Sequence, residues 1–109
     1  MNKFNSINRV ELQGRTGTVR ISPAIGSIAA NFSLMTEHTV ISVEGKKVVE
    51  TTWHNVLAVE GDDVNLEGVT RGSVVHLTGR LRTVRYTAAD GGERTFTEVV
   101  ADSLKVLEM

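Results

Sequence analysis

The chain has no cysteine, one proline, one tryptophan, one tyrosine and three phenylalanines among 109 residues. Without cysteine, disulfides and thiolate zinc sites are excluded, which is compatible with a reducing compartment. No apolar run approaches the roughly 20 residues that a membrane-spanning helix needs, and the start MNKFNSINRVELQG has no apolar signal-peptide core. We therefore expect a cytoplasmic protein.

Residue patterns typical of catalysis are also missing. The sequence has no G-x-S-x-G elbow and no phosphate-binding P-loop. His38, His54 and His76 belong to three separate segments without the short spacing of a metal site. The acidic residues cluster only between Gly61 and Glu67, where a solvated capping turn is the simpler interpretation. We expect a protein that is not an enzyme and that binds no cofactor or metal.

The composition is that of a soluble globular protein, with 40% hydrophobic and 23% charged residues. The length favours one domain over residues 1–109, with a core from about 7 to 107. Because the formal net charge is only -1, attraction for an anionic partner has to come from a local patch of basic residues.

Most of the chain alternates with period two and is rich in Val, Ile and Thr, which predicts half-buried strands. Glu44 to Lys47 and Asp90 to Gly92 read as hairpin turns, and Ser22-Pro23 is expected to interrupt a strand. Residues 61–70 predict a short helix or turn. These short strands favour an all-β fold, a small closed or half-closed barrel.

Alternation also predicts which side chains share a face. On three strands it groups Ala30, Phe32 and Leu34; His54, Val56 and Ala58; and Val75, Leu77 and Leu81, the last three expected to point inward. Trp53 falls on the face opposite His54, so it is either a core residue of a second layer or an exposed stacking platform. Gly79 suggests a β-bulge where the barrel turns a corner.

Positive charge concentrates in GRLRTVRYT, residues 79–87. Arg80 and Arg82 share parity with Tyr86, whereas Arg85 has the opposite parity. A protein that binds a nucleic-acid strand needs cations to contact the phosphates and, beside them, an aromatic ring on which a base can stack. The alternative is an edge strand made soluble by arginines. Lys46 and Lys47 either form a solvated hairpin tip or line a nucleic-acid-binding groove together with these arginines and Tyr86.

The ordered motifs TTWHNV (51–56), RGSVVHLTGRLRT (71–83) and RYTAADGGERTFTEVVA (85–101) resemble the core of the bacterial single-stranded-DNA-binding proteins. INRVELQGRTG (7–17) and AANFSLMTE (29–37) resemble the first strands of that family, in the same order. The resemblance runs from about Asn8 to Ala101. It implies an OB-fold, a five-stranded Greek-key barrel with a helix between the third and fourth strands.

The resemblance further implies sequence-independent binding of single-stranded DNA in replication, recombination or repair, at the nucleoid, and assembly as a homo-oligomer, usually a tetramer. It assigns base stacking to Trp53 and Tyr86. His54 matches a histidine of the family's subunit interface, although the sequence fits equally well a core histidine whose ring nitrogens have hydrogen-bond partners. The arginines at or beside positions that follow the DNA backbone are Arg9, Arg15, Arg20, Arg71, Arg82 and Arg85.

The sequence also departs from the family pattern. His38-Thr39-Val40 and Val59 stand where the family often has aromatic residues, so we expect thinner stacking. The family's acidic C-terminal tip has no counterpart before Met109, so we expect no replication partners recruited through it. The alternative function is an OB-fold protein-protein adaptor or primosome-type component, with Trp53, Leu57 and Val59 in the contact.

Overall fold

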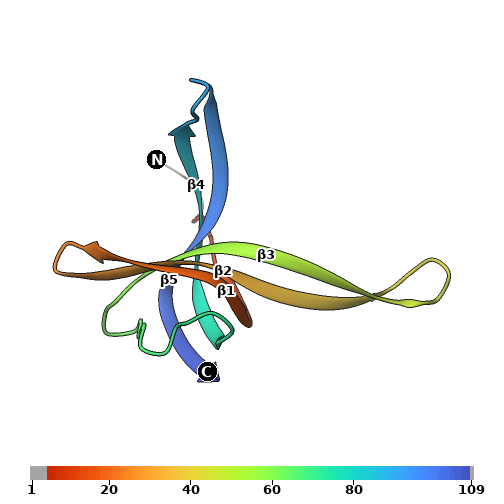
Figure 1. Ribbon diagram of the computed structural model, residues 1–109. Helices are drawn as coiled ribbons and strands as arrows, with labels where there is room; N and C mark the ends of the chain where they lie inside the picture. Colours follow the sequence, from red (N-terminus) through yellow and green to blue (C-terminus); the bar gives the residue numbers. More distant parts are fainter. Residues whose placement is uncertain (1–4, 109) are drawn as a thin grey trace.

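The computed structural model describes residues 5–108, which fold entirely as strands and turns (Figure 1). The strands are β1 (Val10–Ala24), β2 (Ser27–Ile41), β3 (Lys47–Val59), β4 (Val74–Thr87) and β5 (Glu93–Glu108). The predicted all-β class is confirmed. No helix that could span a membrane occurs in this described part of the chain.

The strands close into a ring in the order β1-β2-β3-β5-β4. Neighbours in the ring are antiparallel except β3 and β5, which run parallel and share only the pairs Val56 with Val99 and Leu57 with Val100. β1 returns to pair with β4 from Val10 opposite Gly79 to Arg15 opposite Val74. This is the five-stranded Greek-key barrel of an OB-fold, as predicted.

The barrel interior holds the side chains that alternation placed together. Leu34, Val56, Val75 and Leu77 are at most 2% exposed, and Phe32 is 4% exposed. The predicted bulge at Gly79 is also present, because the β4–β5 register shifts between Thr78 and Gly79. A Cβ at Gly79 would lie 2.1 Å from the carbonyl oxygen of Val100, so only glycine fits this crossing.

Leu81 was expected in the core, and this prediction is wrong. Its side chain is 48% exposed, because β4 leaves the barrel at the Gly79 bulge and continues into solvent paired only with β5. We call this projecting two-stranded segment, residues 80–100, the β4–β5 arm; it rises at the top of Figure 1. Alternation persists along it, but its side chains are covered only at its base, where Glu98 and Val99 are 6% and 2% exposed.

Residues 60–73 contain turns and two isolated bridges, so the helix implied by the family resemblance is absent from this segment and the turn alternative holds. Gly68 and Gly72 have φ of 84° and 89°, outside the helical region. The Glu60 carboxylate accepts a hydrogen bond from the Leu66 amide at 2.7 Å, which replaces helical bonding. Val64, Leu66 and Val69 nevertheless plug one end of the core.

Ser22-Pro23 does not interrupt β1, contrary to the prediction. Pro23 pairs with Ile28 in the β1–β2 ladder, and beyond Arg15 β1 has β2 as its sole partner. Proline is tolerated on such an edge because no second strand needs its missing N–H. The chain then turns at Gly26, whose φ is 69°.

Long hairpins give the molecule an open outline. The β1–β2 and β2–β3 hairpins extend to opposite sides of the barrel, and the β4–β5 arm projects in a third direction (Figure 1). The Cα radius of gyration is 16.5 Å, against about 13 Å for a compact chain of this length. The exposed hairpins therefore provide much of the surface available to a ligand.

Candidate nucleic-acid interface

Trp53 lies on the outer face of β3 and is 58% exposed, so the core alternative for this residue does not apply. Its ring rests on the backbone of Gly17, where an added Cβ would come within 2.8 Å of Cζ3 and 2.5 Å of the Ser33 Oγ. Gly17 sits in the irregular stretch of β1 between Thr16 and Val19. The six-membered ring of the indole therefore packs against β1 while much of the side chain is open to solvent.

A small pocket of about 190 Å³ joins Trp53 to the base of the β4–β5 arm. We call it the Trp53 pocket. It is lined by Trp53, His54, Asn55, Leu81, Thr97, Glu98 and Val99. Leu81, the residue misplaced by the sequence pattern, thus adds apolar surface next to the exposed tryptophan.

A larger pocket of about 380 Å³ lies beside it, over the outer surface of β1, β2 and β3. We call it the Asn31 pocket. Its lining residues are Thr18, Arg20, Asn31, Phe32, Ser33, Asn55, Val56, Phe96 and Glu98. Asn55 and Glu98 belong to both pockets, which makes the two hollows parts of one surface.

Tyr86 lies on the arm and packs against Phe96, with ring centroids 5.9 Å apart and an interplanar angle of 60°. The rings are 48% and 39% exposed. Phe96 pairs with Val84 and Tyr86 with Arg94, so the aromatic contact is diagonal across the two strands. Phe96 also lines the Asn31 pocket, and it thereby links Tyr86 to that hollow.

The arm has two faces. Tyr86, Arg82 and Arg80 share one face with Phe96 and Glu98, as their common parity predicted. Leu81, Thr83 and Arg85 share the other face with Thr97 and Val99, three of which line the Trp53 pocket. The Trp53 pocket is thus lined mainly by the arm face opposite Tyr86, and Glu98 contributes to it from the Tyr86 face.

Arg82 forms an ion pair with Glu98, its Nη2 donating to Oε1 at 2.5 Å. The two residues are cross-strand partners, and the Glu98 side chain is only 8% exposed. The guanidinium of Arg82 is 42% exposed but already holds a carboxylate. Arg82 thus differs electrostatically from the other candidate arginines.

The remaining arginines lie around the barrel and the arm. The Asn8 amide exchanges two hydrogen bonds with the Leu81 backbone, which places Arg9 beside Arg80. Arg15 donates to the Gly72 carbonyl at 2.6 Å. Arg20 lines the Asn31 pocket, and Thr18 separates it from Arg71 in the adjoining hollow. Across residues 5–108, no acid forms an ion pair with any of the arginines in this paragraph.

Lys46 and Lys47 are exposed at the tip of the β2–β3 hairpin. Lys47 precedes Trp53 by six residues of extended strand, a separation of about 20 Å. The two lysines are thus not part of either pocket. They could contact only a ligand long enough to follow the hairpin.

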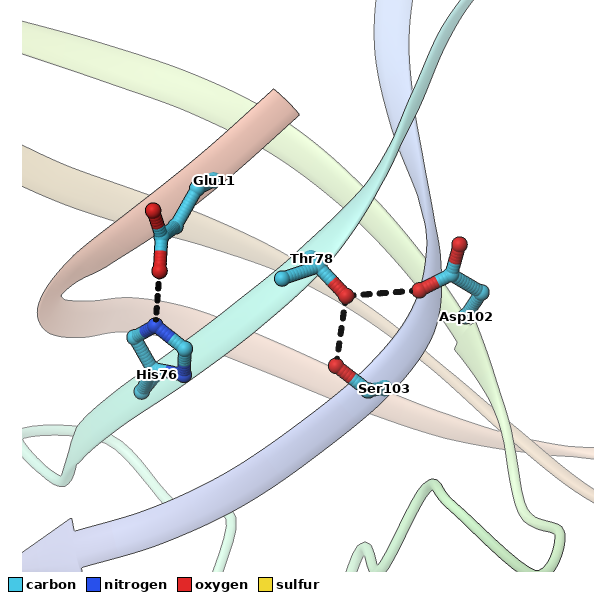
Figure 2. Close-up of polar contacts among 5 residues, drawn as sticks. All are labelled: Glu11, His76, Thr78, Asp102 and Ser103. Carbon is cyan, nitrogen blue, oxygen red and sulfur yellow. Dashed lines mark hydrogen bonds and ion pairs between the residues drawn. The ribbon is translucent and has the colours of Figure 1, made fainter. Parts of the chain in front are cut away.

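His54 is half-buried, and its Nε2 lies 2.9 Å from the Thr36 Oγ1. His76 contacts Glu11 at 2.7 Å on the outer face of β1 and β4, beside a second cluster in which Thr78 donates to Asp102 and contacts Ser103 (Figure 2). His76 and His54 thus have separate polar partners. Among residues 5–108, no group of three metal-ligating side chains is found.

Phe96 and Glu98, like Asn31 and Asn55, line this surface and were not among the sequence-based candidates. Phe96 and Glu98 alternate along β5 within TFTEV, a signal that could have placed them on one face. Their importance depends on the β3–β5 contact and on the β4–β5 register, which no local pattern specifies. The structure brings them to the centre of the surface.

The family model for the single-strand binding protein family matches residues 7–107. The chain belongs to the single-strand binding protein family. Family members include single-stranded DNA-binding proteins of two Neisseria meningitidis strains, each 35% identical over 106 residues. These matches cover 94% of this chain, which spans 60% of the length of the Neisseria proteins.

A Clostridium tetani single-stranded DNA-binding protein is 30% identical over 105 residues, which are 94% of this chain and 71% of that protein. Among solved structures, the Plasmodium falciparum SSB complex with ssDNA has a TM-score of 0.81 at 23% identity, covering 100% of this family member and 99% of that chain. A deletion mutant of the Thermus aquaticus single-stranded DNA binding protein has a TM-score of 0.75 at 20% identity, covering 94% and 51%. These likenesses show that the fold is shared.

Proposed function

We propose that residues 7–107 form one non-catalytic OB-fold domain that binds single-stranded DNA with little dependence on sequence, in replication, recombination or repair. The observation that carries this proposal is the open indole of Trp53, supported on Gly17 and joined by two pockets to the arm. Family membership supports the same function. We place its site of action in the cytoplasm, at the nucleoid.

Stacking and charge neutralisation would act together. Base stacking on an aromatic side chain contributes about 1–3 kcal/mol per base and tolerates any sequence, because every base has a π-face. Trp53, Tyr86 and Phe96 offer such faces. Arg20 lines the Asn31 pocket together with Phe96, and Arg71 lines the adjoining hollow. Arg9 and Arg80 adjoin each other at the root of the arm.

The geometry also constrains the path of the DNA. Because the Trp53 pocket is lined mainly by the arm face opposite Tyr86, we expect one strand that contacts both rings to bend around the arm. A flexible single strand can follow such a path, whereas a stiff duplex, with a persistence length of about 50 nm, cannot bend so sharply. The proposal therefore includes selection of single-stranded over double-stranded DNA.

We also propose that the protein assembles as a homo-oligomer, with His54 near the subunit contact. Half-burial of His54 in the isolated chain leaves surface that a second copy could cover. Sedimentation of the protein with and without DNA would give the number of subunits. A monomeric mass in both conditions would contradict the assembly and leave DNA binding untouched.

The deciding experiment is a titration with oligo(dT), followed through the fluorescence of Trp53, the one tryptophan in the chain. We expect quenching, and a logarithm of affinity that falls linearly with the logarithm of salt concentration, by about 0.7 for each phosphate neutralised. A duplex of equal length serves as the control and should bind more weakly. Absence of both quenching and a gel shift at low salt would reject the proposal.

A further inference from the structure

Glu98 lines both the Trp53 pocket and the Asn31 pocket and stands at their junction. A carboxylate at the centre of a surface that binds a polyanion weakens binding, unless the carboxylate is neutralised or accepts a hydrogen bond from the ligand. Arg82 holds Glu98 in place through Oε1, and 8% of the Glu98 side chain remains exposed. Glu98 lines both pockets, so this small exposed part of the side chain lies at their walls.

The Asn31 pocket has the properties of a subsite for a single base. Its volume of about 380 Å³ falls within the range of roughly 300–1,000 Å³ for small-molecule pockets. Phe96 supplies a partly open ring at its wall, and Arg20 supplies a cation. The amides of Asn31 and Asn55 are exposed there, and they can donate and accept hydrogen bonds.

Proteins read unstacked bases through hydrogen bonds to the Watson–Crick edge combined with stacking. An ionised carboxylate only accepts hydrogen bonds, and its matched partner among base edges is the exocyclic amino group of cytosine. Thymine instead presents the O4 acceptor at that position, so its lone pairs face the carboxylate oxygen. The chemistry of Glu98 thus distinguishes two pyrimidines of nearly equal size.

We propose that the Asn31 pocket binds one base of the single strand and that Glu98, oriented by Arg82, favours cytosine over thymine there. The inference rests on the proposed function, because it requires that single-stranded DNA crosses this surface. It adds a local base preference to binding that is otherwise tolerant of sequence. Glu98 is the specificity-determining residue, and Phe96 supplies the stacking face.

The test compares oligo(dC) with oligo(dT) of equal length on the wild-type protein, Glu98→Gln and Glu93→Gln. Glu93 lies at the far end of the arm on the same strand and is exposed, so its variant removes the same charge outside both pockets. Glutamine at 98 can donate to thymine O4. We expect Glu98→Gln to lower the ratio of oligo(dC) to oligo(dT) affinity at least about five-fold, and Glu93→Gln to leave the ratio unchanged.

If Glu98→Gln raises both affinities by the same factor, Glu98 acts through charge alone and the inference is wrong. If neither oligonucleotide binds the wild-type protein, the proposed function itself fails. Should Glu98→Gln not fold, as judged by circular dichroism, the wild-type protein still decides the matter with oligo(dC) methylated twice at N4. Loss of both amino hydrogens should weaken binding about five-fold or more, and equal affinity for the two oligonucleotides would overturn the inference.

Discussion

The indole of Trp53 occupies the space that a side chain at position 17 would need, since a Cβ on Gly17 would lie 2.8 Å from Cζ3. Two strands thus contribute to one stacking platform: β3 supplies the ring and β1 supplies the bare backbone beneath it. The orientation of the ring depends on the absence of a side chain across the sheet.

Trp53→Ala should weaken binding of labelled oligo(dT) by about 1–3 kcal/mol. The side chain is 58% exposed and lies outside the core, so folding should persist. Fluorescence anisotropy of the labelled oligonucleotide measures the affinity, and circular dichroism checks the fold. A variant that no longer unfolds cooperatively would show that the ring is needed for the core.

Gly17→Ala should also reduce affinity, by roughly 1 kcal/mol, because the new methyl group displaces the indole or the Ser33 hydroxyl. Gly61→Ala is the matched control, since its Cβ would meet only the Val59 carbonyl at 3.9 Å. Both variants keep Trp53, so its fluorescence reports ring position and binding together. Equal affinities for the two variants would refute the packing argument.

Tyr86→Ala and Phe96→Ala should each weaken binding, and their effects should not add. The two rings contact each other at 5.9 Å, so removing one also disturbs the position of the other. Residues in contact show coupling energies of about 0.5–3 kcal/mol in double-mutant cycles, and a cycle of oligo(dT) affinities should detect a coupling between these two rings. Strict additivity would mean that the rings bind DNA independently.

Arg80→Gln should reduce the salt dependence of binding more than Arg82→Gln. Arg80 has no ion pair with an acid in residues 5–108, whereas Arg82 is held by Glu98. Loss of one phosphate contact lowers the slope of log affinity against log salt by about 0.7. Titrations over a range of salt concentrations measure both slopes, and equal reductions would show that DNA takes Arg82 away from Glu98.

Gly79→Ala should destabilise the fold by about 1–3 kcal/mol or more. Its methyl group would lie 2.1 Å from the Val100 carbonyl oxygen and 2.9 Å from the Ala101 Cα, both backbone atoms that cannot rotate away. Urea denaturation measures the loss, with Gly61→Ala again as the reference. Unchanged stability would mean that the β4–β5 crossing can open at little cost.

Alternation and glycine positions were sufficient to predict most of the strands, the side chains of β2 and β3 that share a face, the core positions of Val75 and Leu77, and the bulge at Gly79. These features depend on local chemistry: side-chain parity, and a glycine where two backbones cross. The same parity failed at Leu81, because alternation tells which face a side chain occupies and not whether that face is covered. Coverage depended on where β4 separates from β1, a tertiary property.

The candidate site was only partly accessible from sequence for the same reason. Trp53 and Tyr86 stand out by residue type, and both are exposed as a stacking role requires. The pairing of Arg82 with Glu98 depends on the register of two strands sixteen residues apart at that point. Charge counted along the chain therefore overstated the free positive charge of the arm.

The join between β3 and β5 is the least paired in the ring, with only two residue pairs, Val56 with Val99 and Leu57 with Val100. Both pockets span this join, with Asn55 on one side and Glu98 on the other. A ligand that contacts both β3 and β5 would hold these two strands together. Binding of the ligand would then stabilise the closed barrel, so the fraction of protein bound and the resistance of the barrel to local opening would rise together.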